Sequence, residues 1–265
     1  MNIFLRELKA NSRSLFFWCL FIVFFIYMGI SKFSAFTAVD SDIMAMLEGI
    51  PPVVLEGLQL NAFNLTTITG YYGVMQSYFA LMAAIFAVLL GNGIIAKEER
   101  DKTVEFSLTL PIPRHKLITG KVAAALVNCA IFVLVMWGGS IVAAQPYQPD
   151  EAFYQFLGML MLSSFFIELI FLTIGVLLGA AMKEYKRSGS VAVFILFGTF
   201  IFSILSALSE DLEFLKYFSP FVYFDPLKLL NESKFDPGYL AISAAICIIS
   251  LGLAYFSYAK RDLYI

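Results

Sequence analysis

One carboxylate, Glu168, lies inside a long apolar stretch of the sequence, SSFFIELIFLTIG. A charged side chain within a membrane span is costly, and by default it marks an ion pathway or a proton relay. The same carboxylate could instead be protonated, or bond to a Ser, Thr or Asn on a neighbouring helix. No basic residue lies deep inside an apolar stretch, so the sequence offers this carboxylate no basic partner. The structural interpretation is therefore favoured, and Glu168 is kept as a possible polar residue of a transport pathway.

Other residue types that support catalysis are sparse. His115 is the only histidine, and Cys19, Cys129 and Cys247 each lie within an apolar run. No HExxH, GxSxG or Walker GxxxxGK[ST] motif occurs, and there is no CxxC or Cys/His cluster. No pair of aspartates lies inside the apolar stretches. We therefore expect neither catalysis nor a metal site in this chain.

The composition is typical of an integral membrane protein. Hydrophobic residues make up 60% of the chain and charged residues 14%, whereas soluble domains carry about 25% charged residues. A net charge of −2 gives no indication of nucleic-acid binding. Six apolar stretches have the roughly 20 residues that a bilayer requires. They predict an all-α protein, with residues 1–265 in one transmembrane domain and spans at about 15–36, 72–96, 117–144, 153–182, 189–208 and 238–259.

The basic residues predict the orientation of these spans. If the N-terminus lies in the cytoplasm, most of the 18 Lys and Arg residues fall in cytoplasmic segments and most acids fall outside. This distribution follows the positive-inside rule. We expect a multi-pass protein of the cell membrane with both termini in the cytoplasm.

Two segments outside the spans have the composition of membrane-surface elements. At the N-terminus, NIFLRELKANSRS places Phe4 and Leu8 near one face, with Arg6 and Lys9 around the rest. This pattern predicts a helix lying on the inner membrane surface, where bases meet anionic lipid. Before the last span, FLKYFSPFVYFDPL is too apolar for a free loop, so we expect it at the membrane interface. Its apolar residues and prolines are Phe214, Tyr217, Phe218, Pro220, Phe221, Tyr223, Phe224 and Pro226.

Small and polar residues inside the spans are expected to serve packing. Gly175 and Gly179 form a GxxxG pattern that could allow two helices to approach closely. Asn92 and Asn128 are polar points near the expected cytoplasmic ends of their spans.

The densest charge lies in residues 94–121, IIAKEERDKTVEFSLTLPIPRHKLITGK. The pattern predicts a short helix that ends before Pro111, then a rigid turn and a basic re-entry into the membrane. A loop that only fixes the orientation of the spans in the membrane would need basic residues alone. This segment alternates acid, base and apolar residues, which is typical of a docking surface where mixed charge gives specificity.

The same segment resembles the first cytoplasmic loop of ABC-2-type transporter permeases, in its acidic pair, its Thr-x-Glu stretch, its proline turn and its Gly-Lys re-entry. Four further segments resemble parts of that family in the same order along the chain. They are NIFLRELKANSRSLFFW (the elbow helix), NLTTITGYYG, KYFSPFVYFDPLKLL and the ending AKRDLYI.

The resemblance implies a type V exporter-like fold with an N-terminal elbow helix, a cytoplasmic coupling helix and a re-entrant extracellular segment that caps the pathway. It implies a bacterial permease without an ATPase of its own, so ATP and Mg²⁺ would bind to a partner ATPase subunit and this chain would hold no cofactor. A second permease chain, identical or not, would complete the pathway. The ATPase contacts would be Lys97, Glu98, Glu99, Arg100, Asp101, Lys102, Thr103, Glu105, Phe106, Arg114 and Lys116, with lesser contacts at Lys183, Glu184, Lys186 and Arg187.

The expected function is ATP-driven export of an apolar or amphipathic cargo such as a peptide, antibiotic, drug or lipid. Two alternatives stay open. One is an ion- or proton-coupled carrier that works alone through Glu168, although the sequence shows no convincing internal repeat. The other is a membrane assembly or sensor protein that transports nothing.

Overall fold

The computed structural model describes residues 3–34, 63–100, 113–182, 184–208 and 210–260. Within these residues, six helices are long and apolar enough to cross a membrane, which confirms the predicted all-α membrane fold. Their bounds are α1 (Ile3–Ser31), α5 (Ile68–Arg100), α7 (Arg114–Ala144), α8 (Glu151–Ala181), α9 (Tyr185–Leu208) and α12 (Pro237–Lys260).

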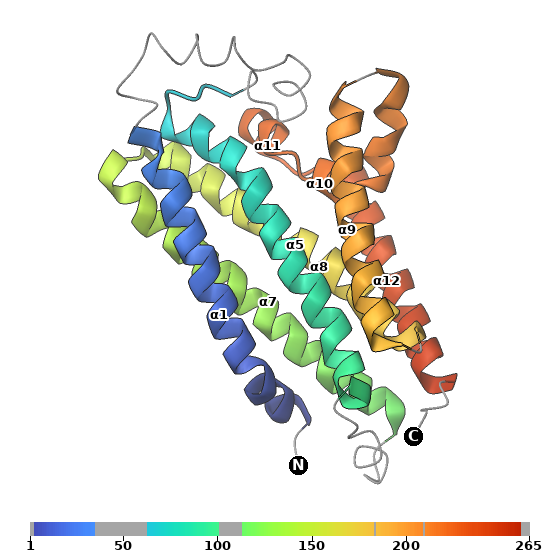
Figure 1. The fold of residues 1–265 in the computed structure, drawn as a ribbon. Helices are drawn as coiled ribbons and strands as arrows, with labels where there is room; N and C mark the ends of the chain where they lie inside the picture. The colour runs from blue at the N-terminus through green and yellow to red at the C-terminus, as the bar shows by residue number, and fades with distance from the viewer. Residues whose placement is uncertain (1–2, 35–62, 101–112, 183, 209, 261–265) are drawn as a thin grey trace.

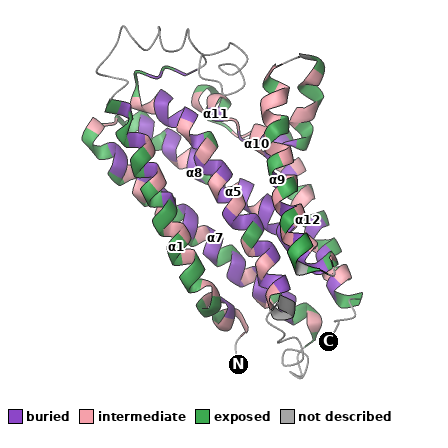
Figure 2. Ribbon diagram, in the orientation of Figure 1, coloured by how far each residue is buried: buried purple, intermediate pink, exposed green. Residues whose placement is uncertain are grey.

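Helices α5 and α8 form the centre of the bundle. In Figure 1, α1 and α7 lie on one side of this pair, and α9 and α12 lie on the other. About two-thirds (67%) of the most apolar window of α5 and of α8 is buried, against 17% for α1, 11% for α9 and 17% for α12. Figure 2 shows the same contrast between the central and the peripheral helices. The exposed apolar faces of the peripheral helices are therefore suited to contact lipid or another membrane protein.

Three glycines allow α5 and α8 to touch through their backbones. A Cβ on Gly91 would lie 2.3 Å from the carbonyl oxygen of Leu172, and a Cβ on Gly175 would lie 2.4 Å from that of Val88. A Cβ on Gly179 would lie 2.8 Å from the carbonyl oxygen of Asn92. No larger residue fits at these distances. The interpretation of Gly175 and Gly179 as a close-contact pair is therefore confirmed, and we name these three residues the glycine contact.

The N-terminal segment differs from the prediction of a separate surface helix. Residues 3–31 form one helix, without a boundary between the amphipathic segment and the first span. The sequence offers no Pro or Gly there to end a helix. Its polar residues also bond back to the same helix: the Asn11 side chain donates to the Glu7 carbonyl at 2.9 Å, and the Ser12 hydroxyl donates to the Lys9 carbonyl at 2.8 Å. The predicted residues Phe4, Arg6, Leu8 and Lys9 therefore lie on the first turns of α1.

The segment between α9 and α12 folds into three short helices: η2 (Glu210–Phe218), α10 (Pro220–Tyr223) and α11 (Pro226–Glu232). A proline begins both α10 and α11, where its missing N–H costs no helical hydrogen bond. The Asp225 side chain caps α11 by accepting from the Leu227 amide at 3.0 Å. These turns allow the chain to fold back against the bundle (Figure 1).

Candidate functional site

Both chain termini lie at the same end of the bundle, which we call the terminal end (Figure 1). The predicted ATPase contacts that the structure describes lie there. Lys97 is half-buried, and Glu98, Glu99 and Arg100 form the last turn of α5, beyond the predicted end of that span at residue 96. Lys116 is exposed on the first turn of α7. The contacts at Asp101, Lys102, Thr103, Glu105 and Phe106 lie outside the described residues.

Arg114, another predicted ATPase contact, links two helices at the terminal end. Its guanidinium donates to the carbonyl oxygen of Ala259 at 3.0 Å, in the last turn of α12. The free carbonyls at a helix C-terminus favour a cation. Arg114 therefore fastens the start of α7 to the end of α12, a role that the sequence did not suggest.

The described residues among the predicted lesser contacts lie at the start of α9, also at the terminal end. Glu184, Lys186 and Arg187 are exposed, and Lys183 lies outside the described residues. The Arg187 Nε atom pairs with the Glu184 carboxylate at 2.9 Å. Exposed ion pairs contribute little stability, so these side chains are free to exchange partners.

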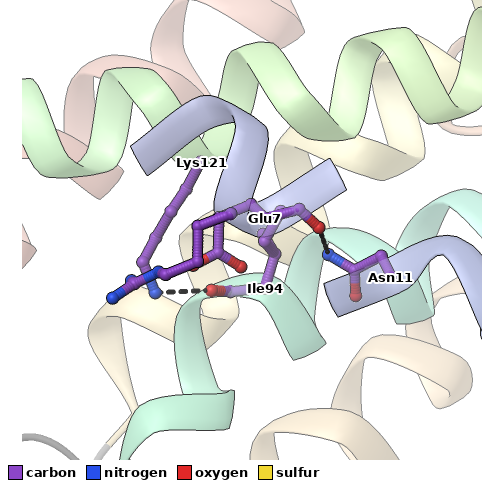
Figure 3. A network of polar contacts seen from close by, with 5 residues as sticks. Glu7, Asn11, Ile94 and Lys121 are labelled. Carbon is purple, nitrogen blue, oxygen red and sulfur yellow. Dashed lines mark hydrogen bonds and ion pairs between the residues drawn. The ribbon is translucent and has the colours of Figure 1, made fainter. Parts of the chain in front are cut away.

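Buried polar residues of α1 and α7 lie beside α5 at the terminal end, and we call them the buried network (Figure 3). The Lys121 ammonium, on a side chain only 1% exposed, donates to the carbonyl oxygen of Ile94 at 2.9 Å. Glu7 is 4% exposed; its carboxylate pairs with Arg6 at 3.0 Å, and its carbonyl accepts from Asn11. A buried ammonium must be hydrogen-bonded to offset its lost hydration. The network therefore holds α7 against the last turns of α5.

Sequence reasoning missed this network. Lys121 counted only as one base among those that set the topology, and Glu7 was not singled out. One signal was present: Lys121 is followed directly by the apolar run VAAALV, which predicts burial for its neighbours.

A pocket of about 250 Å³ lies toward the opposite end of the bundle. Its walls come from α5, α8, α9 and the segment between α9 and α12. Inside it are an amide and several hydroxyls: Gln76, Ser77, Ser163, Ser203 and Ser206. Charges of both signs also line it: Glu213, Lys216, Asp225 and Lys228. We call this site the opposite-end pocket. The sequence did not predict it, because its polar residues are scattered over three spans.

Gln76 is almost fully buried in the wall of this pocket. Its amide nitrogen donates to the Ser164 hydroxyl at 2.7 Å, while its amide oxygen has no hydrogen-bond partner among the described residues. An unpaired buried acceptor costs free energy. The oxygen is therefore suited to accept a hydrogen bond from a bound polar group.

The predicted aromatic cap divides into two parts. Pro220, Tyr223, Phe224 and Pro226 are buried, whereas Phe214, Tyr217 and Phe218 are more than half exposed. The ring of Phe221 lies 5.4 Å from that of Phe171 and 5.3 Å from that of Phe200. Phe171 is about 30 Å along α8 from its start at Glu151. The buried part therefore reaches far along the bundle, and Phe221, Phe224 and Pro226 also line the opposite-end pocket.

An ion pair marks the rim of the opposite-end pocket. The Lys216 ammonium lies 2.5 Å from the Glu213 carboxylate. The hydrogen bond from Lys216 and its charge lower the pKa of Glu213 below its ordinary value. The same hydrogen bond raises the pKa of Lys216. Both groups therefore stay charged near neutral pH.

Glu168 lies outside the opposite-end pocket. It is fully buried beside Cys129 of α7, and neither carboxylate oxygen has a hydrogen bond of good geometry within the described residues. The described lining of the opposite-end pocket includes its neighbours Ser163 and Ile167, but not Glu168 itself. Glu168 and the polar groups of the opposite-end pocket therefore lie in different parts of the bundle.

Comparison with known families settles the classification. The family model described as "ABC-2 family transporter protein" matches residues 1–263, nearly the whole chain. The chain belongs to the ABC-2 transporter family. This ABC-2 protein is thus a multi-pass membrane component of a transport system, as its six apolar helices also indicate. A search of curated proteins found no match.

Proposed function

We propose that this ABC-2 protein is the permease subunit of an ATP-driven exporter, with a separate ATPase subunit docked at its terminal end. That end is then cytoplasmic. The observation that carries the proposal is the continuity of α5. This one helix of 33 residues holds the docking residues Lys97–Arg100 at one end and lines the opposite-end pocket with residues 74–80 at the other.

A continuous helix can transmit a push at one end to the other. Lys97 and Gln76 are 21 residues apart, which is about 32 Å along a helix that rises about 1.5 Å per residue. The glycine contact makes α8 move with α5, and the Lys121 bond to Ile94 links α7 to the same helix. Closure of the ATPase pair would therefore tilt this group of helices against α9 and change the opposite-end pocket. Such rigid-body shifts of packed helices are an established kind of switching transition.

The pocket supports an amphipathic cargo. Hydroxyl and amide groups lie beside apolar surface from Val74, Ile167 and Phe221, with both charge signs also present. Its volume of about 250 Å³ is below the roughly 300–1,000 Å³ of pockets that hold a whole drug-sized molecule. We therefore expect a second permease chain, identical or related, to complete the pathway.

Co-purification tests the proposal. The chain is extracted from membranes in several mild detergents, and a co-purifying soluble-type ATPase of about 25–35 kDa, or one to two domains, is sought. The test variant carries Glu99→Lys and Glu105→Lys in the expected docking segment. The control is Glu232→Lys, a charge reversal at an exposed position of α11, in the segment before the last span.

Wild type and the control should retain the ATPase, and the double variant should lose it while eluting as the same folded species. Absence of any ATPase from the wild-type protein would contradict the proposal. Retention of the ATPase by the double variant would contradict the docking residues alone.

An ion-coupled carrier is the second candidate, because Glu168 is a buried carboxylate without a hydrogen-bond partner among the described residues. Its position outside the described lining of the opposite-end pocket favours the first candidate. Glu168→Gln distinguishes the two. If the carboxylate carries ions, this variant abolishes uptake into vesicles that lack ATP; if it is structural, ATP-driven transport persists.

A further inference from the structure

A second cavity, of about 350 Å³, lies between α1 and α5 at the terminal end. We call it the α1–α5 groove. The side chains of Asn11, Arg13 and Ser14 line it from α1, and Ile94 and Lys97 line it from α5. Figure 3 shows Asn11 and Ile94 from close by. The proposed export mechanism uses only two residues of this lining, Lys97 as a docking residue and Ile94 as the acceptor of the Lys121 hydrogen bond.

The groove changes from cationic to apolar along its length. Arg13 and Lys97 lie toward the terminal end, while Trp18, Phe86 and Leu89 lie further along the helices. Lys97 and Phe86 are about 16 Å apart along α5. That length matches half of a hydrocarbon core of about 30 Å. The groove therefore passes from headgroup depth into the depth of acyl chains.

The two cations have no counter-charge inside the described structure. Neither Arg13 nor Lys97 forms an ion pair there, and no acidic residue is among the described lining. Trp18 is also suited to the membrane interface, where its ring meets headgroups. Its indole packs on Phe86 at 5.7 Å and forms part of the apolar wall. Exposed Phe17 and Phe21 continue the apolar surface of α1 beyond it.

We propose that the α1–α5 groove binds one anionic phospholipid of the adjacent leaflet. The phosphate lies between Arg13 and Lys97, Asn11 and Ser14 offer hydrogen bonds to the headgroup, and the acyl chains follow Trp18, Phe86 and Leu89. The site requires only that the chain spans a membrane, so it does not rest on the proposed export function.

Charge argues for lipid over a second copy of this chain. A two-fold interface places the same patch of both subunits together. Here it would bring Arg13 and Lys97 toward their own counterparts without an acidic partner in the described lining. An anionic headgroup supplies the missing charge.

Native mass spectrometry of the full chain in neutral detergent tests the site. The protein is titrated with phosphatidylglycerol and, separately, with phosphatidylcholine that has the same acyl chains. The test variant is R13Q/K97Q. The control is K116Q/K186Q, which removes two exposed cations at the same end that are not among the described lining of the groove.

Wild type should bind its first phosphatidylglycerol more tightly than its first phosphatidylcholine. R13Q/K97Q should weaken phosphatidylglycerol binding about 30-fold, equivalent to about 2 kcal/mol, because each cation near a membrane surface contributes about 1 kcal/mol. The control should leave the affinity nearly unchanged. Equal affinity of wild type for both lipids, or equal losses in the two variants, would overturn the proposal.

Gly93→Leu tests the same site without removing a charge. Gly93 lines the groove, and an added Cβ there meets nothing within 4 Å, so a larger side chain starts in open space. It should weaken phosphatidylglycerol binding and preserve the fold. Loss of a dimer without a change in bound lipid would assign the groove to a second copy. Displacement of the lipid by an equal concentration of glycerol phosphate would assign it to a soluble phosphate. Either result would overturn the lipid proposal.

Discussion

Replacing Gly175 with alanine would force α5 and α8 apart. The new methyl group would lie 2.4 Å from the Val88 carbonyl oxygen and 2.9 Å from the Asn92 amide nitrogen. Ordinary contacts of a Cβ begin at 3.4 Å, so the helices must separate by about 1 Å. Both opposing atoms belong to the backbone of a helix and cannot rotate away.

The size of the effect follows from two opposing terms. Overpacking a tight contact costs about 1–3 kcal/mol. Alanine in place of glycine favours a helix by about 1 kcal/mol. Gly93→Ala is the matched control, because Gly93 lies on the same central helix pair and an added Cβ there meets nothing within 4 Å. The difference between the two variants isolates the packing term, so G175A should be less stable than G93A by about 1–3 kcal/mol.

The free energies of unfolding of G175A and G93A can be measured by reversible unfolding in mixtures of dodecyl maltoside and sodium dodecyl sulfate. Tryptophan fluorescence follows the transition. The ABC-2 protein has two tryptophans, one of which, Trp18, packs against α5. Equal stability of G175A and G93A would refute the backbone contact between α5 and α8. It would also remove the reason for α8 to move with α5.

Three further predictions use the same unfolding assay. Lys121→Met should lower the free energy of unfolding by about 2 kcal/mol, because a buried hydrogen bond from a charged donor is lost; an unchanged value would contradict the buried network. Asp150→Ala should cost about 1 kcal/mol, because Asp150 caps α8. The pKa of Glu213 is lowered by Lys216, so their pairing stabilises the fold above pH 4.5 and is lost as the pH falls through the lowered pKa. The small stability difference between wild type and K216Q should therefore be constant from about pH 5 to pH 9 and shrink as the pH falls below 4.5 through the lowered pKa. A difference that persists in acid would contradict this pairing.

The helices were the predictable part of the fold. Each long apolar run of the sequence became one helix, because a bilayer leaves few other ways to satisfy the backbone. The GxxxG pattern at Gly175 and Gly179 also predicted a close contact correctly. Its partner helix was not predictable, since Gly91 belongs to no such pattern and its role depends on which faces of α5 and α8 meet.

The features missed from the sequence depend on tertiary contacts. Lys121 counted only as a base at the start of the third span, yet its side chain is 1% exposed and bonds to Ile94 of α5. The first span was expected to begin near residue 15, yet its helix begins at Ile3, because polarity alone does not end a helix. The opposite-end pocket collects Gln76 and Ser203 from spans more than 100 residues apart, a separation that no local pattern reveals.

The central claim is that α5 carries motion from the ATPase to the opposite-end pocket. Spin labels at Ser77 of α5 and Ser206 of α9 measure the distance between these helices across the pocket, which both residues line. The background replaces the three native cysteines by serine, and the complex with the co-purified ATPase is studied by pulsed electron paramagnetic resonance. The distance distribution should shift when ATP is trapped in the complex, and it should stay unchanged in the E99K/E105K variant. An unchanged distribution in the wild-type complex with trapped ATP would contradict the account.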